Sequence, residues 1–206
     1  MTIDDIMRRA GVIPVLVLDG ALDPAALAET LVAAGLPVIE VTLRTAGALD
    51  AIRVMARVPG AIVGAGTVLD EAQLAQAIDA GSRFVVSPGL SHRVALAARD
   101  SGVPFLPGVA TASDIMRGLE LGLDRFKFFP AETSGGIGAL KALAGPFPAV
   151  RFCPTGGIRA ETAADWLALE AVLCVGGSWI VQQGKADLAE IGQQARKAAE
   201  LSPTRC

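Results

Sequence analysis

The feature that most constrains the fold is an alternation, along the whole chain, of short apolar runs with alanine- and leucine-rich amphipathic stretches. The apolar runs are bounded by glycine or proline and have the length of strands buried on both faces. They are residues 12–18, 37–43, 61–66, 83–87, 103–108, 125–130, 150–155 and 171–177. Eight strand–helix units in 206 residues predict a (β/α)8 TIM barrel formed by one domain, 1–206. A doubly wound sheet is the structural alternative.

The stretches between the predicted strands carry signals for helix starts and stops. Asp23 followed by Pro24 is typical of a helix N-terminus. Two further starts resemble capping boxes, and four glycines look like C-terminal stops. These residues are Thr111 with Asp114, Asp70 with Gln73, and Gly35, Gly81, Gly102 and Gly122. A short extra helix, "DDIMRRA", is expected before the first strand.

Composition and charge argue against several classes of protein. A net charge of −3 provides no basic surface for nucleic acid and no polybasic patch for a membrane. No apolar run reaches the roughly 18 residues of a membrane span, and "MTIDDIMRRAG" lacks the apolar segment of a secretory signal. The three cysteines, Cys153, Cys174 and Cys206, are odd in number and widely spaced. We therefore expect reduced thiols in a cytoplasmic protein.

The chain contains a single histidine, His92. A metal site with two or three histidines therefore cannot form within one chain, and a Ser-His-Asp triad could form only around His92. Ser91 resembles an N-cap, which places His92 in the first turn of a helix. We expect a cap-region histidine rather than a catalytic one.

The stretch "FKFFPAE" places a lysine among phenylalanines. Alternate residues of a strand share a face, so Lys127 and Phe129 point one way and Phe126 and Phe128 the other. If the second pair packs on helices, Lys127 points into the barrel. Burial without a partner disfavours the ammonium form, and a neutral amine attacks carbonyls to form a Schiff base. The alternative is a lysine that reaches the rim or pairs with a carboxylate.

The second predicted strand, "PVIEVTLRT", carries Glu40, Thr42 and Arg44 on one face. Three successive polar residues on an inward face are not typical of a packed core. Glu40 could act as a general acid and base, and Arg44 could bind a substrate carboxylate. The alternative is an internal ion pair of Glu40 with Lys127 or Arg44 that performs no chemistry.

The third predicted strand ends in "GAGT", which places the hydroxyl of Thr67 just beyond the strand. Gly64 and Gly66 resemble the start of a dinucleotide-binding fingerprint, but Leu69 stands where its third glycine belongs. The sequence therefore argues against a Rossmann-type site.

Glycine pairs follow the last two predicted strands. Gly156 and Gly157 follow the seventh, and "GGS" ending at Ser178 follows the eighth. Barrels often bind phosphate in these two loops, with help from a short helix, and glycines let backbone N–H groups approach the anion. We expect a phosphate site here and a short helix that begins at Ser178.

The motifs "EVTLRT", "GAGTVL", "SPG", "KFFPAE", "CPTGGI" and "GGSW", in this order and spacing, resemble the 2-keto-3-deoxy-6-phosphogluconate (KDPG) aldolase and 4-hydroxy-2-oxoglutarate (KHG) aldolase family. The resemblance extends from about Val12 to Ile180. It implies a homotrimeric, metal-free, cofactor-free class I aldolase. Such an enzyme cleaves KDPG to pyruvate and glyceraldehyde 3-phosphate in the Entner–Doudoroff pathway, and activity on 4-hydroxy-2-oxoglutarate is an open possibility.

The resemblance also implies roles for single residues. Lys127 matches the Schiff-base lysine and Glu40 the proton-shuttling carboxylate. The remaining matches are residues that hold the pyruvate carboxylate (Arg44, Thr67), a phosphate cradle (Gly156, Gly157, Ser178) and neighbours that line the site (Pro88, Phe129, Thr155).

The chain departs from the family pattern at Ala46, which stands where many relatives carry an acid near the arginine. Substrate preference is therefore less constrained than the lysine chemistry. A 2-keto-3-deoxy-6-phosphogalactonate aldolase ranks second. Two other classes remain open: a phosphate-binding barrel isomerase or synthase without a covalent intermediate, and a barrel that binds phosphosugar acids without turnover.

Overall fold

Parallel strands form a ring in the computed structural model, which describes residues 1–182, 184 and 187–201. The described strands are β1 (Val12–Leu16), β2 (Val38–Thr42), β3 (Ile62–Gly66), β4 (Phe84–Val86), β5 (Phe105–Leu106), β6 (Gly108–Val109), β7 (Arg125–Phe128), β8 (Arg151–Pro154) and β9 (Val175–Gly177). All eight predicted runs contain a strand. The run 103–108 holds β5 and the start of β6, which are separated by Pro107, a residue without an N–H to donate.

The pairing of these strands closes the barrel. Hydrogen-bonded neighbours follow the orders β5-β4-β3-β2-β1-β9 and β6-β7-β8. Bridges from Phe152 to Val172 and from Thr155 to Gly176 connect β8 to the β9 segment. Because the first strand, β1, pairs with the last, β9, which is itself bridged to β8, the sheet closes on itself, and the doubly wound alternative is wrong. The predicted (β/α)8 barrel is confirmed.

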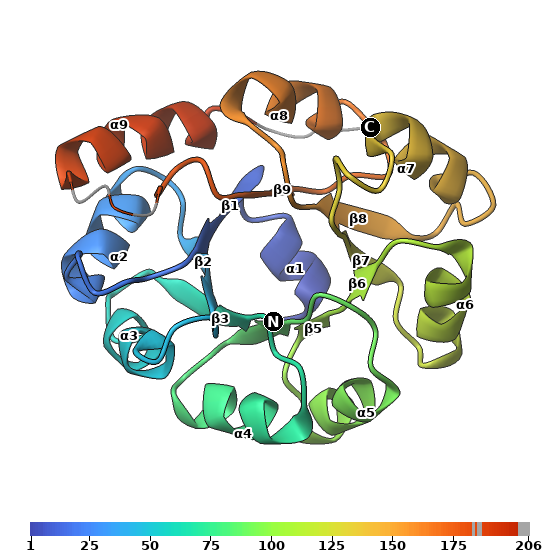
Figure 1. The fold of residues 1–206 in the computed structure, drawn as a ribbon, viewed down its shortest axis with the longest axis horizontal. Coiled ribbons are helices and arrows are strands. Elements are labelled where there is room, and N and C mark those ends of the chain that lie inside the picture. The colour runs from blue at the N-terminus through green and yellow to red at the C-terminus, as the bar shows by residue number, and fades with distance from the viewer. Residues whose placement is uncertain (183, 185–186, 202–206) are drawn as a thin grey trace.

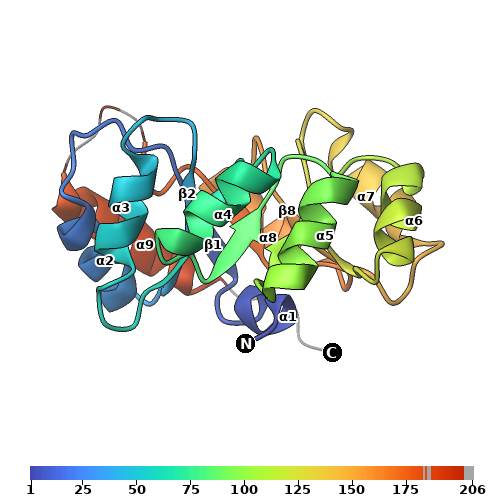
Figure 2. The same ribbon diagram turned by 90° about the horizontal axis from the view of Figure 1, so that it is seen from below.

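Helices surround the ring in Figure 1, and one further helix lies across its end. They are α1 (Ile3–Met7), α2 (Pro24–Ala33), α3 (Ala48–Met55), α4 (Glu71–Asp79), α5 (His92–Ser101), α6 (Ala112–Glu120), α7 (Gly136–Ala144), α8 (Ala160–Leu167) and α9 (Leu188–Ala199). The predicted extra helix is α1. Figure 2 shows it below the barrel, at the end where β1 begins.

Most of the predicted caps are present. The Asp23 carboxylate accepts from the N–H of Ala26 at 2.8 Å, and Thr111 forms a complete capping box with Asp114. The second predicted box is only half formed, because the Gln73 side chain accepts from the N–H of Leu69 rather than from the N-cap. The four stop glycines, Gly35, Gly81, Gly102 and Gly122, all have positive φ.

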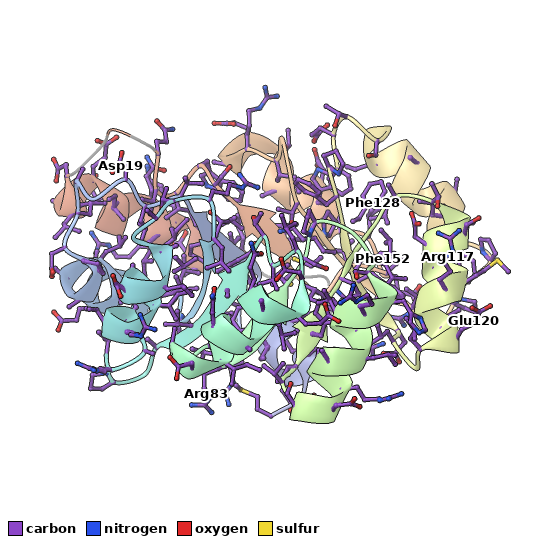
Figure 3. All side chains as sticks on the ribbon, turned by 60° about the horizontal axis from the view of Figure 1, so that its bottom comes forward. Asp19, Arg83, Arg117, Glu120, Phe128 and Phe152 are labelled. Atoms are coloured by element: carbon purple, nitrogen blue, oxygen red, sulfur yellow. The ribbon has the colours of Figure 1, made fainter. Side chains whose placement is uncertain are left out.

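Two apolar layers follow from the alternation of side chains along the strands. The outer layer, between strands and helices, contains Phe126 and Phe128 as predicted. Phe128 and Phe152 lie inside the molecule in Figure 3, whereas Glu120 stands on the outside of α6. The inner layer contains Val38 and is closed from below by Ile6 of α1. The inner layer is therefore mainly apolar toward its lower end, below Glu40 and Lys127.

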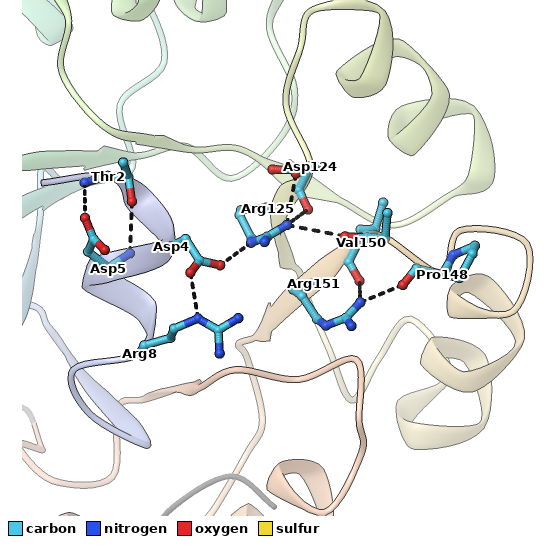
Figure 4. A network of polar contacts seen from close by, with 10 residues as sticks. Thr2, Asp4, Asp5, Arg8, Asp124, Arg125, Pro148, Val150 and Arg151 are labelled. Atoms are coloured by element: carbon cyan, nitrogen blue, oxygen red, sulfur yellow. Dashed lines mark hydrogen bonds and ion pairs between the residues drawn. The ribbon is translucent and has the colours of Figure 1, made fainter. Parts of the chain in front are cut away.

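A charged network ties α1 to the lower end of β7 (Figure 4). Asp4 accepts from Nε of Arg8 and from Nε of Arg125, each at 2.6 Å. Burial raises the pKa of Asp4, but hydrogen bonds from the two guanidinium groups lower it, so the pKa lies below its ordinary value. Arg125 lies on the same face of β7 as Lys127. It binds α1 at the lower end of the strand, whereas Lys127 lies toward the upper end.

Cys153 and Cys174 are free thiols buried in the inner layer, as expected for small core residues, and Cys206 lies outside the described residues. None of the helices in the described ranges is long and apolar enough to cross a membrane.

Candidate active site

Lys127 and Glu40 meet inside the upper half of the barrel. The Lys127 ammonium lies 2.9 Å from Oε1 of Glu40, and each residue is only 4% exposed. They come from β7 and β2, which are not neighbours in the sheet, so the pair spans the interior. The predicted burial of Lys127 is confirmed. Of the two possibilities left open for a buried Lys127, alone or paired with a carboxylate, the structure has the second, because Glu40 reaches it across the barrel.

Glycine makes room for the Glu40 carboxylate. Gly66 pairs with Thr42 on the adjacent strand, and a Cβ built on Gly66 would stand 2.7 Å from Cγ of Glu40 and overlap its Oε1. Real Cβ atoms do not approach neighbours so closely, so any larger residue would displace the carboxylate. Thr42 itself is engaged elsewhere: its hydroxyl donates to the carbonyl of Leu16 at 2.8 Å.

The surroundings of the pair are apolar below and aromatic to one side. The Lys127 ammonium lies 5.3 Å from the ring centroid of Phe129, within reach of a cation–π interaction. Cys153 is the cross-strand partner of Lys127. Burial raises the pKa of the Cys174 thiol well above its ordinary value, with further contributions from Cys153 and the charge of Glu40. The buried Cys174 thiol is therefore held in its neutral form.

Arg44 and Thr67 stand together at the mouth of the barrel. Nε of Arg44 donates to Oγ1 of Thr67 at 3.3 Å, which joins the ends of β2 and β3. Thr67 has φ 60°, a left-handed conformation that a β-branched residue adopts at a cost. Such strain persists where the surrounding structure holds it, commonly at ligand sites. The Arg44 guanidinium is exposed and can meet an incoming carboxylate.

The glycine loop after β8 lies close to the aromatic side of the pair. Gly156 and Gly157 have φ values of 102° and 81°, which only glycine adopts readily. A Cβ on Gly156 would stand 3.4 Å from the Phe129 ring, so the loop borders the ring that flanks Lys127. Thr155, just before the loop, is buried and bridges to Gly176 at the start of the other glycine pair.

Two predicted site residues lie further out at the same end. Ser178 is exposed and follows β9 directly, but residues 178–181 are bends rather than the expected short helix. Ile180 and Val181 are buried there, so apolar packing holds the segment in an irregular path. Pro88 follows β4, and its carbonyl packs so closely on Gly108 that a Cβ there would overlap it.

His92 is the first residue of α5 and is exposed, and its neighbour Ser91 caps the helix by accepting from the N–H of Val94. The prediction of a cap-region histidine is confirmed. Within the ranges that the structure describes, no group of three or more histidine, cysteine, aspartate or glutamate residues could hold a metal ion.

A contact that the sequence did not predict involves Glu132, the last residue of "KFFPAE". Its Oε1 accepts from the indole N–H of Trp166 at 3.2 Å. Its side chain lies against Gly157, where a Cβ would stand 2.7 Å from both Cβ and Cγ of Glu132. The motif itself was the available signal, since it places a charged residue in the loop that follows the strand of Lys127.

Comparisons with known proteins show which family the chain resembles. The family model described as KDPG and KHG aldolase matches residues 3–194. The 2-dehydro-3-deoxy-phosphogluconate aldolase of Zymomonas mobilis is 55% identical over 96% of this chain and 95% of its own length. The KHG/KDPG aldolase of Escherichia coli is 50% identical over 94% of this chain and 90% of its own.

Solved structures show the same likeness. The KDPG aldolase of Zymomonas mobilis with 3-phosphoglycerate has a TM-score of 0.95 at 54% identity, covering 98% of this chain and 96% of that one. The KDPG aldolase of Legionella pneumophila, with pyruvate captured as a covalent carbinolamine, has a TM-score of 0.94 at 40% identity, covering 97% and 99%. A structure described as native KDPGal is more distant, with 26% identity, a TM-score of 0.81 and coverage of 92% and 93%. On the extent of these matches, the chain belongs to the KDPG and KHG aldolase family.

Proposed function

We propose that the protein is a class I aldolase that cleaves KDPG to pyruvate and glyceraldehyde 3-phosphate. The observation that carries the proposal is the buried hydrogen bond between Lys127 and Glu40. A lysine ammonium group must lose a proton before its nitrogen can attack a carbonyl, and a carboxylate at 2.9 Å can take that proton. A purely structural ion pair would not need an open, polar end of the barrel beside it.

In the proposed reaction, the Lys127 nitrogen, having given its proton to Glu40, attacks the C2 ketone, and the carbonyl electron pair moves to oxygen. A proton then passes from the nitrogen to this oxygen to give a carbinolamine. Glu40, directly or through water, supplies the proton with which hydroxide leaves as water, and the imine forms. The positively charged imine is then the electron sink for the next step.

Carbon–carbon cleavage follows from the same two residues. Glu40 takes the proton of the C4 hydroxyl, the oxygen electrons form the aldehyde, and the electrons of the C3–C4 bond move into the imine to give an enamine. Glyceraldehyde 3-phosphate leaves. Protonation at C3 and addition of water to the imine then release pyruvate and restore Lys127.

The other groups at this end of the barrel hold the substrate. Arg44 and Thr67 are placed to bind the carboxylate, and the phosphate cradle (Gly156, Gly157 and Ser178) to bind the distal phosphate. Pro88, Phe129 and Thr155 line the space between. Binding energy at the phosphate positions the bond that breaks.

The proposed substrate is inferred from the names of the relatives. Two relatives at 50–55% identity are named for KDPG, whereas the KDPGal structure is 26% identical, which favours the gluconate series. The relative from Escherichia coli is also named for KHG, so we propose 4-hydroxy-2-oxoglutarate as a second substrate. We further propose that residues 1–206 form one domain of a homotrimer that works in the cytoplasm without a cofactor.

A coupled assay tests the proposal. The purified protein is given KDPG, and pyruvate is followed through lactate dehydrogenase, with the galactonate epimer in parallel. Pyruvate from KDPG at a higher kcat/KM than from the epimer supports the proposal. A higher value for the epimer moves the assignment to the galactonate series, and no pyruvate from either leaves the non-covalent enzyme or the binding protein.

A further inference from the structure

Glu132 lies between a buried tryptophan and the glycine loop after β8, although it touches neither Lys127 nor Glu40 in the contacts described above. We propose that Glu132 is a positioning residue that holds the phosphate cradle in its binding shape and so sets the affinity for phosphorylated ligands. The inference deepens the proposed function and rests on it, because it concerns the part of the same site that would recognise the distal phosphate.

The anchor of this arrangement is Trp166 on α8. Its side chain is fully buried, and its ring packs on Phe128 of β7 with centroids 6.3 Å apart. An indole N–H is a donor only, and when buried it needs an acceptor. Oε1 of Glu132 supplies that acceptor at 3.2 Å. The direction of the Glu132 side chain is thereby fixed by a group that cannot move without disturbing the core.

From this anchor, the stem of Glu132 supports the glycine loop. Its Cβ and Cγ occupy the space beside Gly157, each 2.7 Å from where a Cβ on that glycine would stand. Backbone bonds run alongside: the N–H of Glu132 donates to the carbonyl of Gly156 at 3.1 Å, and the N–H of Ala131 to that of Thr155 at 2.8 Å. The loop therefore lies along a segment whose own position depends on Glu132.

The negative charge of Glu132 opposes phosphate binding, whereas its contacts with the glycine loop favour it. A carboxylate near a phosphate site repels the ligand, so its removal alone would strengthen phosphate binding. Solvent and salt screen such repulsion between exposed groups. Loss of the anchor, by contrast, frees two glycines that have wide conformational freedom, and ordering them again on binding costs affinity. The inference therefore predicts weaker binding when Glu132 is truncated.

Four proteins test this: the unaltered chain, Glu132→Ala, Glu132→Gln and, as a charge-matched control, Glu120→Ala. The glutamine variant keeps the stem and an oxygen that can accept from the indole N–H. Glu120 stands on the outer face of α6 (Figure 3). Each protein is titrated with 3-phosphoglycerate by calorimetry, and its KM and kcat for KDPG are measured. Each is also incubated with pyruvate and borohydride, a readout that involves no phosphate.

We expect Glu132→Ala to raise the Kd of 3-phosphoglycerate and the KM of KDPG about tenfold, with kcat within about twofold. Glu132→Gln and Glu120→Ala should stay within about twofold of the unaltered chain, and all four should give the same yield of reduced pyruvate adduct. Unchanged or tighter 3-phosphoglycerate binding by Glu132→Ala overturns the inference. An equal loss of 3-phosphoglycerate binding and of adduct yield in Glu132→Ala also overturns it. The same holds if the unaltered chain does not bind 3-phosphoglycerate.

The two readouts separate this inference from the proposed function. A missing pyruvate adduct in the unaltered chain, with 3-phosphoglycerate binding that weakens in Glu132→Ala, would contradict the Schiff-base aldolase but support the role of Glu132. Adduct in all four proteins with equal 3-phosphoglycerate affinities would leave the aldolase intact and contradict the role of Glu132.

Discussion

Gly66 leaves open the space that the Glu40 side chain occupies, since a Cβ on Gly66 would stand 2.7 Å from Cγ of Glu40 and overlap its carboxylate. The position of the proposed proton carrier thus depends on the absence of a side chain on the neighbouring strand. The "GAGT" motif therefore contributes to the site through Gly66 as well as through Thr67.

Gly66→Ala should displace the Glu40 carboxylate and lower kcat by roughly 10²-fold, the size of effect expected from a misplacement of about 1 Å. KM for KDPG should change less than kcat, because the phosphate cradle lies on the loops after β8 and β9 rather than beside Gly66. Steady-state kinetics measure both. Gly138→Ala is the control, since a Cβ there meets no atom within 4 Å. An unchanged kcat in Gly66→Ala would show that the clearance has no catalytic role.

Lys127→Ala should abolish turnover, because no other described group occupies the position of its nitrogen. Glu40→Gln should lower kcat about 10²- to 10⁴-fold, the usual contribution of a general acid and base. The coupled pyruvate assay checks both variants. A rate for Glu40→Gln equal to that of the unaltered enzyme would remove Glu40 from the mechanism.

The ion pair of Lys127 and Glu40 should also contribute to the free energy of unfolding. Removing one partner leaves a buried charge unpaired, which typically costs about 3–5 kcal/mol. Lys127→Met should therefore lower the free energy of unfolding, and Lys127→Met with Glu40→Gln should recover part of the loss. Urea denaturation of the two variants measures the difference. A double variant less stable than the single one would mean that Glu40 is stabilised by other groups.

The network around Asp4 predicts a pH dependence of stability. Because the pKa of Asp4 is lowered in the folded state, its contribution is present above the unfolded pKa of about 3.9 and is lost as pH falls through the folded value. Asp4→Asn should cost about 1 kcal/mol at pH 7, discounted for partial exposure, and progressively less below pH 4. Urea denaturation over this range tests it, and a loss independent of pH would contradict it.

Cys174 should resist thiol reagents in the folded protein. Burial raises the pKa of its thiol, and the reactive form is the thiolate. Iodoacetamide at pH 8 should leave Cys174 unmodified in native protein and alkylate it in denaturant, as peptide mass spectrometry can show. Rapid native modification would indicate that the barrel interior opens.

Much of this site could be predicted from local sequence. The alternation of side chains along a strand was sufficient to place Lys127 and Glu40 inside the barrel and Phe126 and Phe128 outside it, because both faces of each strand are buried. The glycine pair Gly156 and Gly157 after the strand was also visible in the sequence, and both residues have a positive φ in the structure.

Other features depend on packing between segments far apart in the chain. The bond from Trp166 to Glu132 joins residues 34 positions apart and depends on the depth at which α8 packs. Whether Lys127 would find Glu40 or remain alone depends on the barrel's width rather than on either strand. The helix expected at Ser178 fails because Ile180 and Val181 pack into the core.

Reductive trapping tests directly whether Lys127 forms a Schiff base. The protein is incubated with pyruvate and borohydride, digested, and the modified peptide is identified by mass spectrometry, with Lys127→Ala as the control. A reduced pyruvyl adduct is expected on Lys127 and is expected to be absent from the control. A folded protein that gives no adduct, or carries it on another lysine, would contradict the assignment of Lys127 as the Schiff-base residue.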